Sequence, residues 1–383
     1  MTYNTLKNLL SIVMAAVTAL FGAALPFGGN GIRVAPAVFE YGEDSYCVMW
    51  ETEKKGAGCV KYTVDGKEKT VWDEELGVIR THETVHRVYV PKAELRDNDY
   101  RVSSQYVFFK YAYAALKGKT VESDVYHFRG EEKQDGIRIL CASDIHEHNA
   151  EALKAAKNSG TEPDLVVILG DVASNMEVKE RFTNALLGNA AALSGGTVPV
   201  VYVRGNHEPR GEFAAQLPGY LPTAGKEMYF TFDFGGLSAV VLDSGEDKED
   251  SHEDYSGLVN FSGYLNEEYE WVRSLSADQF DGKYKLVFSH IPGIQNMWGV
   301  NWAACFGDMG FDMIVGGHLH TCKSWNRNNI PIVSEGGIQD DDYWICSIIL
   351  EGGAVDLRVT DTAGETVYSF GLADGVCTEE KNF

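Results

Sequence analysis

The stretch that decides the fold is IRILCASDIH, residues 137–146. Its short apolar run, bounded by polar residues, predicts a buried strand. Alternate side chains of an extended chain point the same way, so Asp144 and His146 can face one point where the strand ends. A carboxylate oxygen and an imidazole nitrogen that converge on one point suggest a metal ion. One such pair is a weak signal, and further ligands have to come from elsewhere in the chain.

Four later apolar runs also end in residues that can bind metal. They cover about residues 164–171, 198–206, 285–290 and 313–317, and each is expected to be a strand. Glycines beside their ends let the backbone turn sharply. Open α/β sheets place their sites outside the carboxyl ends of strands, so one shared crevice is expected there. The candidate ligands, in chain order, are Asp144, His146, Asp171, Asn206, His290, His318 and His320.

The order of these residues resembles that of the calcineurin-like metallophosphoesterases. The blocks are D-x-H at 144–146, G-D at 170–171, G-N-H-E at 205–208, a single His at 290 and G-H-x-H at 317–320. The resemblance implies two divalent or trivalent metal ions, and the ligand types do not narrow the choice beyond Mn, Fe or Zn. It assigns one ion to Asp144, His146, Asp171 and His320, and the other to Asp171, Asn206, His290 and His318, with Asp171 as the bridge.

The same resemblance implies hydrolysis of a phosphate monoester or diester. A hydroxide that bridges the two metals would attack phosphorus in line with the leaving oxygen. His207 would assist the leaving group, and Asp144 would orient His207 as well as bind metal. Asn206 and Arg210 are the candidates for binding the phosphate of a small substrate, although Arg210 could instead form a salt bridge that holds its loop. Glu208 is expected to tie down that loop.

The chain changes character at a polar joint, residues 130–136. From 32 to 130, short strands separated by turns predict an all-β sandwich of immunoglobulin or fibronectin type. From 136 to 372, strands alternate with helices, which predicts an α/β domain. For that second domain the family resemblance implies a four-layer α/β/β/α sandwich.

The layout of the two regions is similar to that of the purple acid phosphatases. Their N-terminal domain often carries W-x-T, which is matched here by Trp50-Glu51-Thr52. In that family a Tyr three residues after the G-D aspartate binds iron, but this chain has Ser174 there. The D-x-H histidine, which that family lacks, is kept here as His146. An iron–tyrosinate site is therefore not expected.

Composition and the N-terminus restrict the partners and the location. A net charge of −23 over 383 residues disfavours binding to nucleic acid or to an anionic membrane surface. Residues 9–25 are free of charge and follow Lys7, which predicts an export signal or a membrane anchor within residues 1–28. The protein is thus expected to be secreted or membrane-anchored and extracytoplasmic, with a buried N-terminal helix as the alternative. The seven cysteines lack regular spacing, so free thiols are expected, and a Cys47–Cys59 pair stays open.

Two other functions stay open from the sequence. A nucleotidase or pyrophosphohydrolase of the same superfamily would need a pocket in which a base can stack. A non-catalytic surface protein would instead bind a partner through its β-sandwich. The charged loop at 244–256 is either solvated or overhangs the site, and His148 matches no ligand position. The sequence does not indicate an oligomeric state.

Overall fold

The computed structural model describes residues 12, 30–112, 114–222, 227–292, 301–373 and 375–383. Within these residues, no helix has the length and apolar character needed to span a membrane. Apart from residue 12, the predicted export signal or anchor of residues 1–28 lies outside the described residues.

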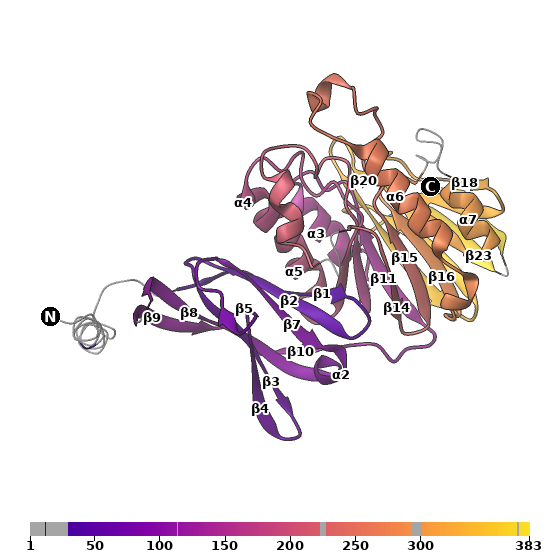
Figure 1. Ribbon diagram of the computed structural model, residues 1–383. Coiled ribbons are helices and arrows are strands. Elements are labelled where there is room, and N and C mark those ends of the chain that lie inside the picture. The colour runs from indigo at the N-terminus through magenta and orange to yellow at the C-terminus, as the bar shows by residue number, and fades with distance from the viewer. Residues whose placement is uncertain (1–11, 13–29, 113, 223–226, 293–300, 374) are drawn as a thin grey trace.

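The largest sheet has eleven strands and runs through both halves of the chain (Figure 1). Its order is β24-β23-β22-β21-β11-β12-β13-β1-β2-β7, and β20 pairs with β21. The predicted strand at the start of 137–146 is β11, which pairs in parallel with β12 and antiparallel with β21. The strands are β1 (Ile32–Tyr41), β2 (Ser45–Thr52), β7 (Val85–Pro91), β11 (Ile137–Ala142), β12 (Leu165–Ile168), β13 (Pro199–Tyr202), β20 (Gly337–Ile338), β21 (Tyr343–Glu351), β22 (Ala354–Thr360), β23 (Thr366–Ala373) and β24 (Val376–Asn382).

A second sheet of six strands packs face to face on the first. Its order is β14-β15-β16-β17-β19-β18, and β15, β16, β17 and β19 are parallel neighbours. Along β11, Ile139 and Cys141 point into the core between the two sheets, while Leu140 points to the opposite face, as the period of two requires. The strands are β14 (Phe230–Phe234), β15 (Leu237–Leu242), β16 (Tyr284–Ser289), β17 (Met313–Gly316), β18 (Lys323–Arg327) and β19 (Ile330–Ser334).

Helices cover the outer faces of both sheets (Figure 1). On the first sheet, Ala152 of α3 and Leu186 of the π-helical η1 share a core with Leu140. On the second sheet, Leu265 of α6 and Trp302 of α7 pack on its outer face. The layers are therefore helix, sheet, sheet and helix, and the predicted mixed α/β fold is confirmed. The helices are α2 (Lys92–Leu95), α3 (Asn149–Asn158), α4 (Lys179–Arg181), η1 (Phe182–Leu187), α5 (Gly188–Ser194), α6 (Phe261–Ser274) and α7 (Trp302–Asp308), with short 3₁₀ turns η2 (Ala214–Gly219), η3 (Glu253–Tyr255) and η4 (Ala277–Gln279).

Two helices differ from their predicted form. The sequence predicts one helix over 177–193, which the structure divides into α4, η1 and α5. It also predicts a helix over about 266–275, and the corresponding α6 begins five residues earlier, at Phe261. The reason is Asp250, whose carboxylate accepts hydrogen bonds from the main-chain N–H groups of Phe261 (2.8 Å) and Ser262 (3.2 Å). These groups lack partners inside the helix, so a carboxylate from a preceding loop stabilises an earlier start.

The N-terminal region forms two sheets that face each other. One contains β1, β2 and β7, and the other has the order β10-β8-β3-β4, with β9 paired to β8. Tyr46, Val48 and Trp50 of β2 point into the core between them. The immunoglobulin or fibronectin type of this region stays a prediction. The second sheet contains β3 (Gly56–Val64), β4 (Lys67–Trp72), β8 (Asn98–Tyr111), β9 (Ala114–Glu122) and β10 (Tyr126–Phe128), and β5 (Glu74–Glu75) pairs separately with β6 (Val78–Ile79).

The β1–β2–β7 sheet is continuous with the sheet of the following region. Strand β1 pairs in parallel with β13, with Val38 opposite Pro199 and Phe39 opposite Val200. The polar joint at 130–136 therefore connects two regions that share one hydrogen-bonded sheet. All seven cysteines are free, and Cys47 and Cys59 lie on different sheets.

Candidate metal centre

The carboxyl ends of five strands bring all the candidate ligands to one edge of the two sheets. Asp144 and His146 follow β11, Asp171 follows β12 and Asn206 follows β13, all in the first sheet. His290 follows β16, and His318 and His320 follow β17, all in the second sheet. Three groups have ligand atoms within 4.8 Å of one another: Asp144, His146 and His320; His146, Asp171 and His207; and Asp171, His290 and His318.

The backbone at this edge is held in an uncommon conformation. Five of the seven candidate ligands have a positive φ of 43–67°. Residues other than glycine adopt this left-handed region rarely, and such residues collect at functional sites where the surrounding structure fixes them. At Gly317, an added Cβ would come within 2.5 Å of the Asp144 carboxylate, so only glycine fits beside that ligand. The five ligands with positive φ are Asp144, His146, Asp171, His318 and His320.

One half of the centre is formed by Asp144, His146 and His320. The Asp144 Oδ1 atom lies 3.2 Å from His320 Nε2, and the His146 and His320 rings are 5.4 Å apart. Asp144 is fully buried, and among the described residues its Oδ1 atom accepts no hydrogen bond of good geometry, despite the nearby His320 nitrogen. A buried carboxylate oxygen without such a bond is costly, and a cation bound beside it would remove that cost. The donor set therefore fits a metal ion.

The other half is formed by Asp171, Asn206, His290 and His318. His290 Nε2 lies 3.1 Å from both Asp171 Oδ2 and Asn206 Oδ1. His318 Nδ1 is also 3.1 Å from Asn206 Oδ1. The main-chain oxygen of Leu169 lies 2.6 Å from His290 Nδ1, which fixes this ring with Nε2 toward the centre. Metal-binding histidines commonly use their second nitrogen in this way.

The titration behaviour of this half shows how strongly it attracts positive charge. Burial alone would lower the pKa of His290, but the carboxylates of Asp171 and Asp144 outweigh it and raise the pKa to about 10. Burial likewise opposes ionisation of Asp171, yet His290 lowers the pKa of Asp171 well below its ordinary value. The two buried carboxylates thus favour a positive charge beside them, and a bound cation would supply it.

Comparison with known proteins agrees with this geometry. Residues 137–322 match the family model described as calcineurin-like phosphoesterase. The chain contains a calcineurin-like phosphoesterase domain. The matched region holds all the candidate ligands and supports a phosphoester hydrolase, and metallophosphoesterases of this family use divalent metals. No curated protein matches the sequence.

Solved structures similar to this chain share its fold. One is the purple acid phosphatase PPD1 from yellow lupin (Lupinus luteus) seeds, with 14% identity, a TM-score of 0.61, and 88% of this chain and 74% of that chain covered. Another is PhoD, with 11% identity, a TM-score of 0.59 and 94% of each chain covered. At these identities the similarity concerns the fold alone.

In the phosphoesterase domain, His207 lies beside the metal ligands. Its Nε2 atom is 3.8 Å from Asp171 Oδ2, and its ring is 4.8 Å from the ring of His146. Its Nδ1 atom is 2.9 Å from the main-chain oxygen of Ser174. The recorded partner of His207 Nδ1 is thus the Ser174 oxygen, and an orienting role of Asp144 stays a prediction. The Asp144 carboxylate accepts the main-chain N–H of His318 at 2.8 Å.

Two charged side chains, Glu208 and Arg210, hold the loop of Asn206 and His207 in place. Glu208 accepts hydrogen bonds from the main-chain N–H groups of Gly205 (2.7 Å), Val172 (2.8 Å) and Asp171 (3.1 Å), which confirms its predicted role. Arg210 forms a salt bridge of 2.6 Å with the buried Glu246, the alternative that the sequence had left open for it. Its Nη1 atom also lies 3.1 Å from His207 Nε2.

Two acidic residues at the centre were missed from the sequence. Glu246 and Asp247 follow β15, the neighbour of β16. Glu246 contacts Asn206, and Asp247 contacts His318. The loop at 244–256 therefore overhangs the site at its start, while most of its later residues are exposed. A signal was present, because the apolar run at 237–242 also ends in polar residues.

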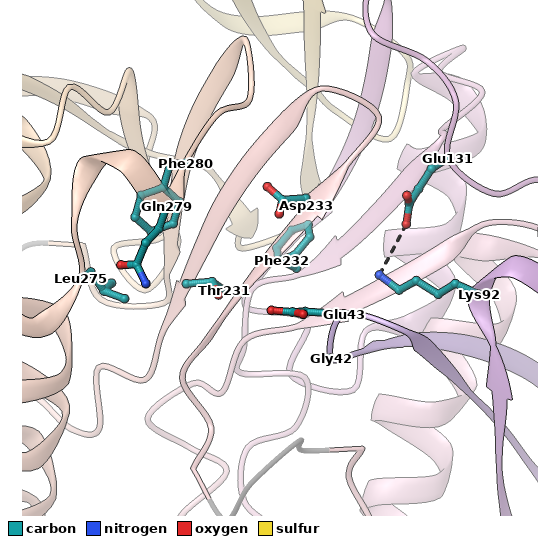
Figure 2. Close-up of a pocket in the computed structure, with 10 residues that line it drawn as sticks. All are labelled: Gly42, Glu43, Lys92, Glu131, Thr231, Phe232, Asp233, Leu275, Gln279 and Phe280. Atoms are coloured by element: carbon teal, nitrogen blue, oxygen red, sulfur yellow. Dashed lines mark ion pairs between the residues drawn. The ribbon is translucent and has the colours of Figure 1, made fainter.

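A cavity of about 230 Å³ lies apart from the metal ligands, between the N-terminal strands and the second sheet (Figure 2). Lys92 and Glu131 line it and form an ion pair of 3.4 Å, and Lys92 also pairs with the buried Glu40 at 2.7 Å. No candidate ligand is among its lining residues in the described part of the chain. The ion pairs here connect β1, α2 and the polar joint at 130–136.

Proposed function

We propose that the phosphoesterase domain hydrolyses a small phosphate monoester or diester at a centre that holds two metal ions. The observation that carries the proposal is the overlap of the ligand groups around Asp171. This residue belongs to two of the three clusters, and each cluster has the carboxylate and imidazole donors that Mn, Fe or Zn accept. When bound, two such ions polarise the phosphoryl oxygens and lower the pKa of a coordinated water.

Each ion has a proposed set of protein ligands. The first set is supported by the buried Oδ1 atom of Asp144, which accepts no hydrogen bond of good geometry among the described residues. The second set is supported by two nitrogens, His290 Nε2 and His318 Nδ1, that both face Asn206 Oδ1. Asp171 would serve both ions, because a carboxylate has two oxygens. The first set is Asp144, His146, Asp171 and His320, and the second is Asp171, Asn206, His290 and His318.

His207 is the proposed proton donor to the leaving oxygen. A neutral main-chain oxygen accepts from Nδ1, so the ring is oriented with Nε2 toward Asp171 and the metal ligands. In this structure Nε2 can accept a hydrogen bond from Arg210 Nη1 at 3.1 Å. Once that guanidinium turns to a phosphoryl oxygen, a proton taken up at Nε2 can pass to the leaving oxygen as the ester bond breaks. Arg210 Nη1, beside this nitrogen, can meet a phosphoryl oxygen while the other side of the guanidinium stays paired with Glu246.

The test compares two esters and one ligand variant. Protein purified with Mn²⁺ is expected to hydrolyse bis-p-nitrophenyl phosphate or p-nitrophenyl phosphate, and the preferred ester identifies the substrate class. Asp171→Ala should reduce the rate to the level seen with a chelator, because it removes a ligand from both ions. His148→Ala is the control, since His148 is exposed and its recorded ion-pair partner is Glu151 on the same helix. Absence of turnover with Mn²⁺, Fe²⁺ and Zn²⁺, or full activity of Asp171→Ala, would refute the proposal.

The proposed location of this activity is outside the cytoplasm. The support is the uncharged run at 9–25 after Lys7, which has the pattern of an export signal or anchor. Fractionation of cells that express the full chain tests this proposal, and activity confined to the cytosol would contradict it.

A further inference from the structure

Three carboxylates follow strand β15 within five residues, and each holds a residue from the metal-binding loops. Asp243 pairs with the buried side of Arg204 at 2.7 Å. Glu246 accepts a hydrogen bond of 2.9 Å from Asn206 Nδ2. Asp247 Oδ2 lies 3.4 Å from His318 Nε2. Because β15 is the parallel neighbour of β16, this loop leaves the second sheet at the edge where the ligands collect.

Glu246 determines which atom of the Asn206 amide faces the centre. An amide can present either oxygen or NH₂, and only the oxygen can bind a cation. The Glu246 carboxylate only accepts hydrogen bonds, so it pairs with the NH₂ and leaves Oδ1 directed to His290 and His318. Glu246 is fully buried and its other oxygen is paired with Arg210, so its own position is fixed.

Asp247 acts in the same way on His318. The Nδ1 atom of this ring faces Asn206 Oδ1 and the centre, which leaves Nε2 for the Asp247 carboxylate. A carboxylate on the second nitrogen of a metal-binding histidine fixes the tautomer and makes the bound nitrogen a stronger donor. The Asp247 side chain is 40% exposed, so this residue can be changed without disturbing a core.

We infer that Glu246 and Asp247 are positioning residues that set the affinity of one of the two metal sites, the one formed around Asn206 and His318. The inference rests on the proposed function, because it assumes a two-ion centre. Neither carboxylate contacts Asp144, His146 or His320 in the recorded interactions of the described residues. Removing either carboxylate should therefore lower the affinity for the ion at the Asn206–His318 site and leave the affinity for the other ion unchanged.

The test measures metal binding separately from activity. Mn²⁺ is titrated by calorimetry into the metal-free full chain, and electron paramagnetic resonance then distinguishes a coupled ion pair from a single ion. The variants are Glu246→Gln, whose amide can pair with Asn206 in either orientation, and Asp247→Asn. The control is Glu249→Gln, which removes the same charge from an exposed residue of the same loop. Thermal unfolding by circular dichroism checks that each variant is folded.

We expect wild type to bind two ions, and Glu249→Gln to bind both ions with the same affinities as wild type. Glu246→Gln and Asp247→Asn should bind one ion as wild type does and the other roughly 10- to 100-fold more weakly, with loss of the coupled signal. Excess Mn²⁺ should restore their activity. If Glu246→Gln does not fold, Asp247→Asn decides the outcome. Two ions bound with wild-type affinity by the folded variants would overturn the inference, whereas a wild-type protein that binds a single ion would instead refute the proposed function.

Discussion

The main-chain oxygen of Ser174 orients His207, and Glu147 holds Ser174 in place. The Glu147 carboxylate accepts from the main-chain N–H of Ser174 (3.1 Å) and from its hydroxyl (2.8 Å), and it pairs with Arg181 at 2.5 Å. Ser174 thus places the side chain that is the proposed proton donor.

Replacing the proton donor should slow the chemical step and leave the metals bound. His207→Gln is expected to lower kcat by about 10²- to 10⁴-fold, the usual range for a lost general acid. The loss should be larger for phenyl phosphate than for p-nitrophenyl phosphate, because p-nitrophenolate leaves with less need of a proton. Steady-state rates with both esters and metal content by mass spectrometry test this. Equal losses for both esters would argue against proton donation.

Loosening the support of His207 should have a smaller effect of the same kind. Glu147→Ala removes both bonds to Ser174, and a misplaced catalytic group can cost up to about 10²-fold in rate. We expect kcat to fall, KM and metal content to stay constant, and the pH profile of kcat to shift. Glu151→Ala, an exposed carboxylate on α3, is the matched control. An unchanged kcat and pH profile in Glu147→Ala would show that Ser174 keeps its place without it.

The sequence predicted the candidate ligands and the role of Glu208, but not the contacts made by Glu246 and Asp247. Asp171 or His290 could be found because each ends an apolar run, a local pattern. Glu246 and Asp247 lie in a run of charges that looks the same whether it is solvated or folded onto a site. Only their contacts with Asn206 and His318, distant in the chain, distinguish the two cases.

At the scale of elements, the loops after β12 and β13 pack so closely that one of them needs glycine. A Cβ at Gly205 would clash with the Asp171 main-chain N and Oδ1 atoms and lie 2.7 Å from Glu208 Oε2. Gly205→Ala is therefore expected to displace Asp171 and reduce metal affinity by at least about 10-fold. Gly219→Ala, where nothing lies within 4 Å, should bind metal as wild type does. Calorimetric titration of both variants tests this, and equal affinities would contradict it.

Strand β1 carries a buried acid whose ionisation opposes folding. Burial raises the pKa of Glu40 to about 7, although Lys92 opposes the shift. A folded-state pKa above the ordinary value means that the native protein keeps a proton which the unfolded chain releases. Stability from this group is therefore present below about pH 4.5 and is lost as the pH rises through 7. The loss is on the order of 3 kcal/mol, at 1.36 kcal/mol per pH unit.

Glu40→Gln should remove this dependence. The free energy of unfolding of the variant minus that of wild type should rise by on the order of 3 kcal/mol between pH 4.5 and pH 8. Lys92 keeps Glu131 as a partner in the variant, so its charge stays paired. Urea unfolding at several pH values measures the difference. Glu43→Gln, an exposed neighbour, is the control and should show a difference that does not vary with pH. A constant difference for Glu40→Gln would contradict the prediction.

At the scale of the whole molecule, the main sheet joins the two regions that composition separates. The polar joint at 130–136 marks a change of strand and helix pattern, which a sequence can show. The pairing of β1 with β13 depends on a meeting of distant segments and has no local signal. The core beneath it is shared as well, because Phe39 and Met49 belong to the same buried cluster as Leu140 and Ile168.

A shared core predicts that the two regions unfold together. Phe39 is 1% exposed and lies opposite Val200, so Phe39→Ala should cost about 3–5 kcal/mol of unfolding free energy. Hydrogen exchange followed by peptide mass spectrometry should then show faster exchange in β12 and β13 as well as in β1 and β2. Phe109→Ala, at a side chain that is 49% exposed, should change stability by about 0.5 kcal/mol or less. If Phe39→Ala accelerated exchange only before residue 130, the N-terminal region would be an independent unit that contacts the phosphoesterase domain without stabilising it.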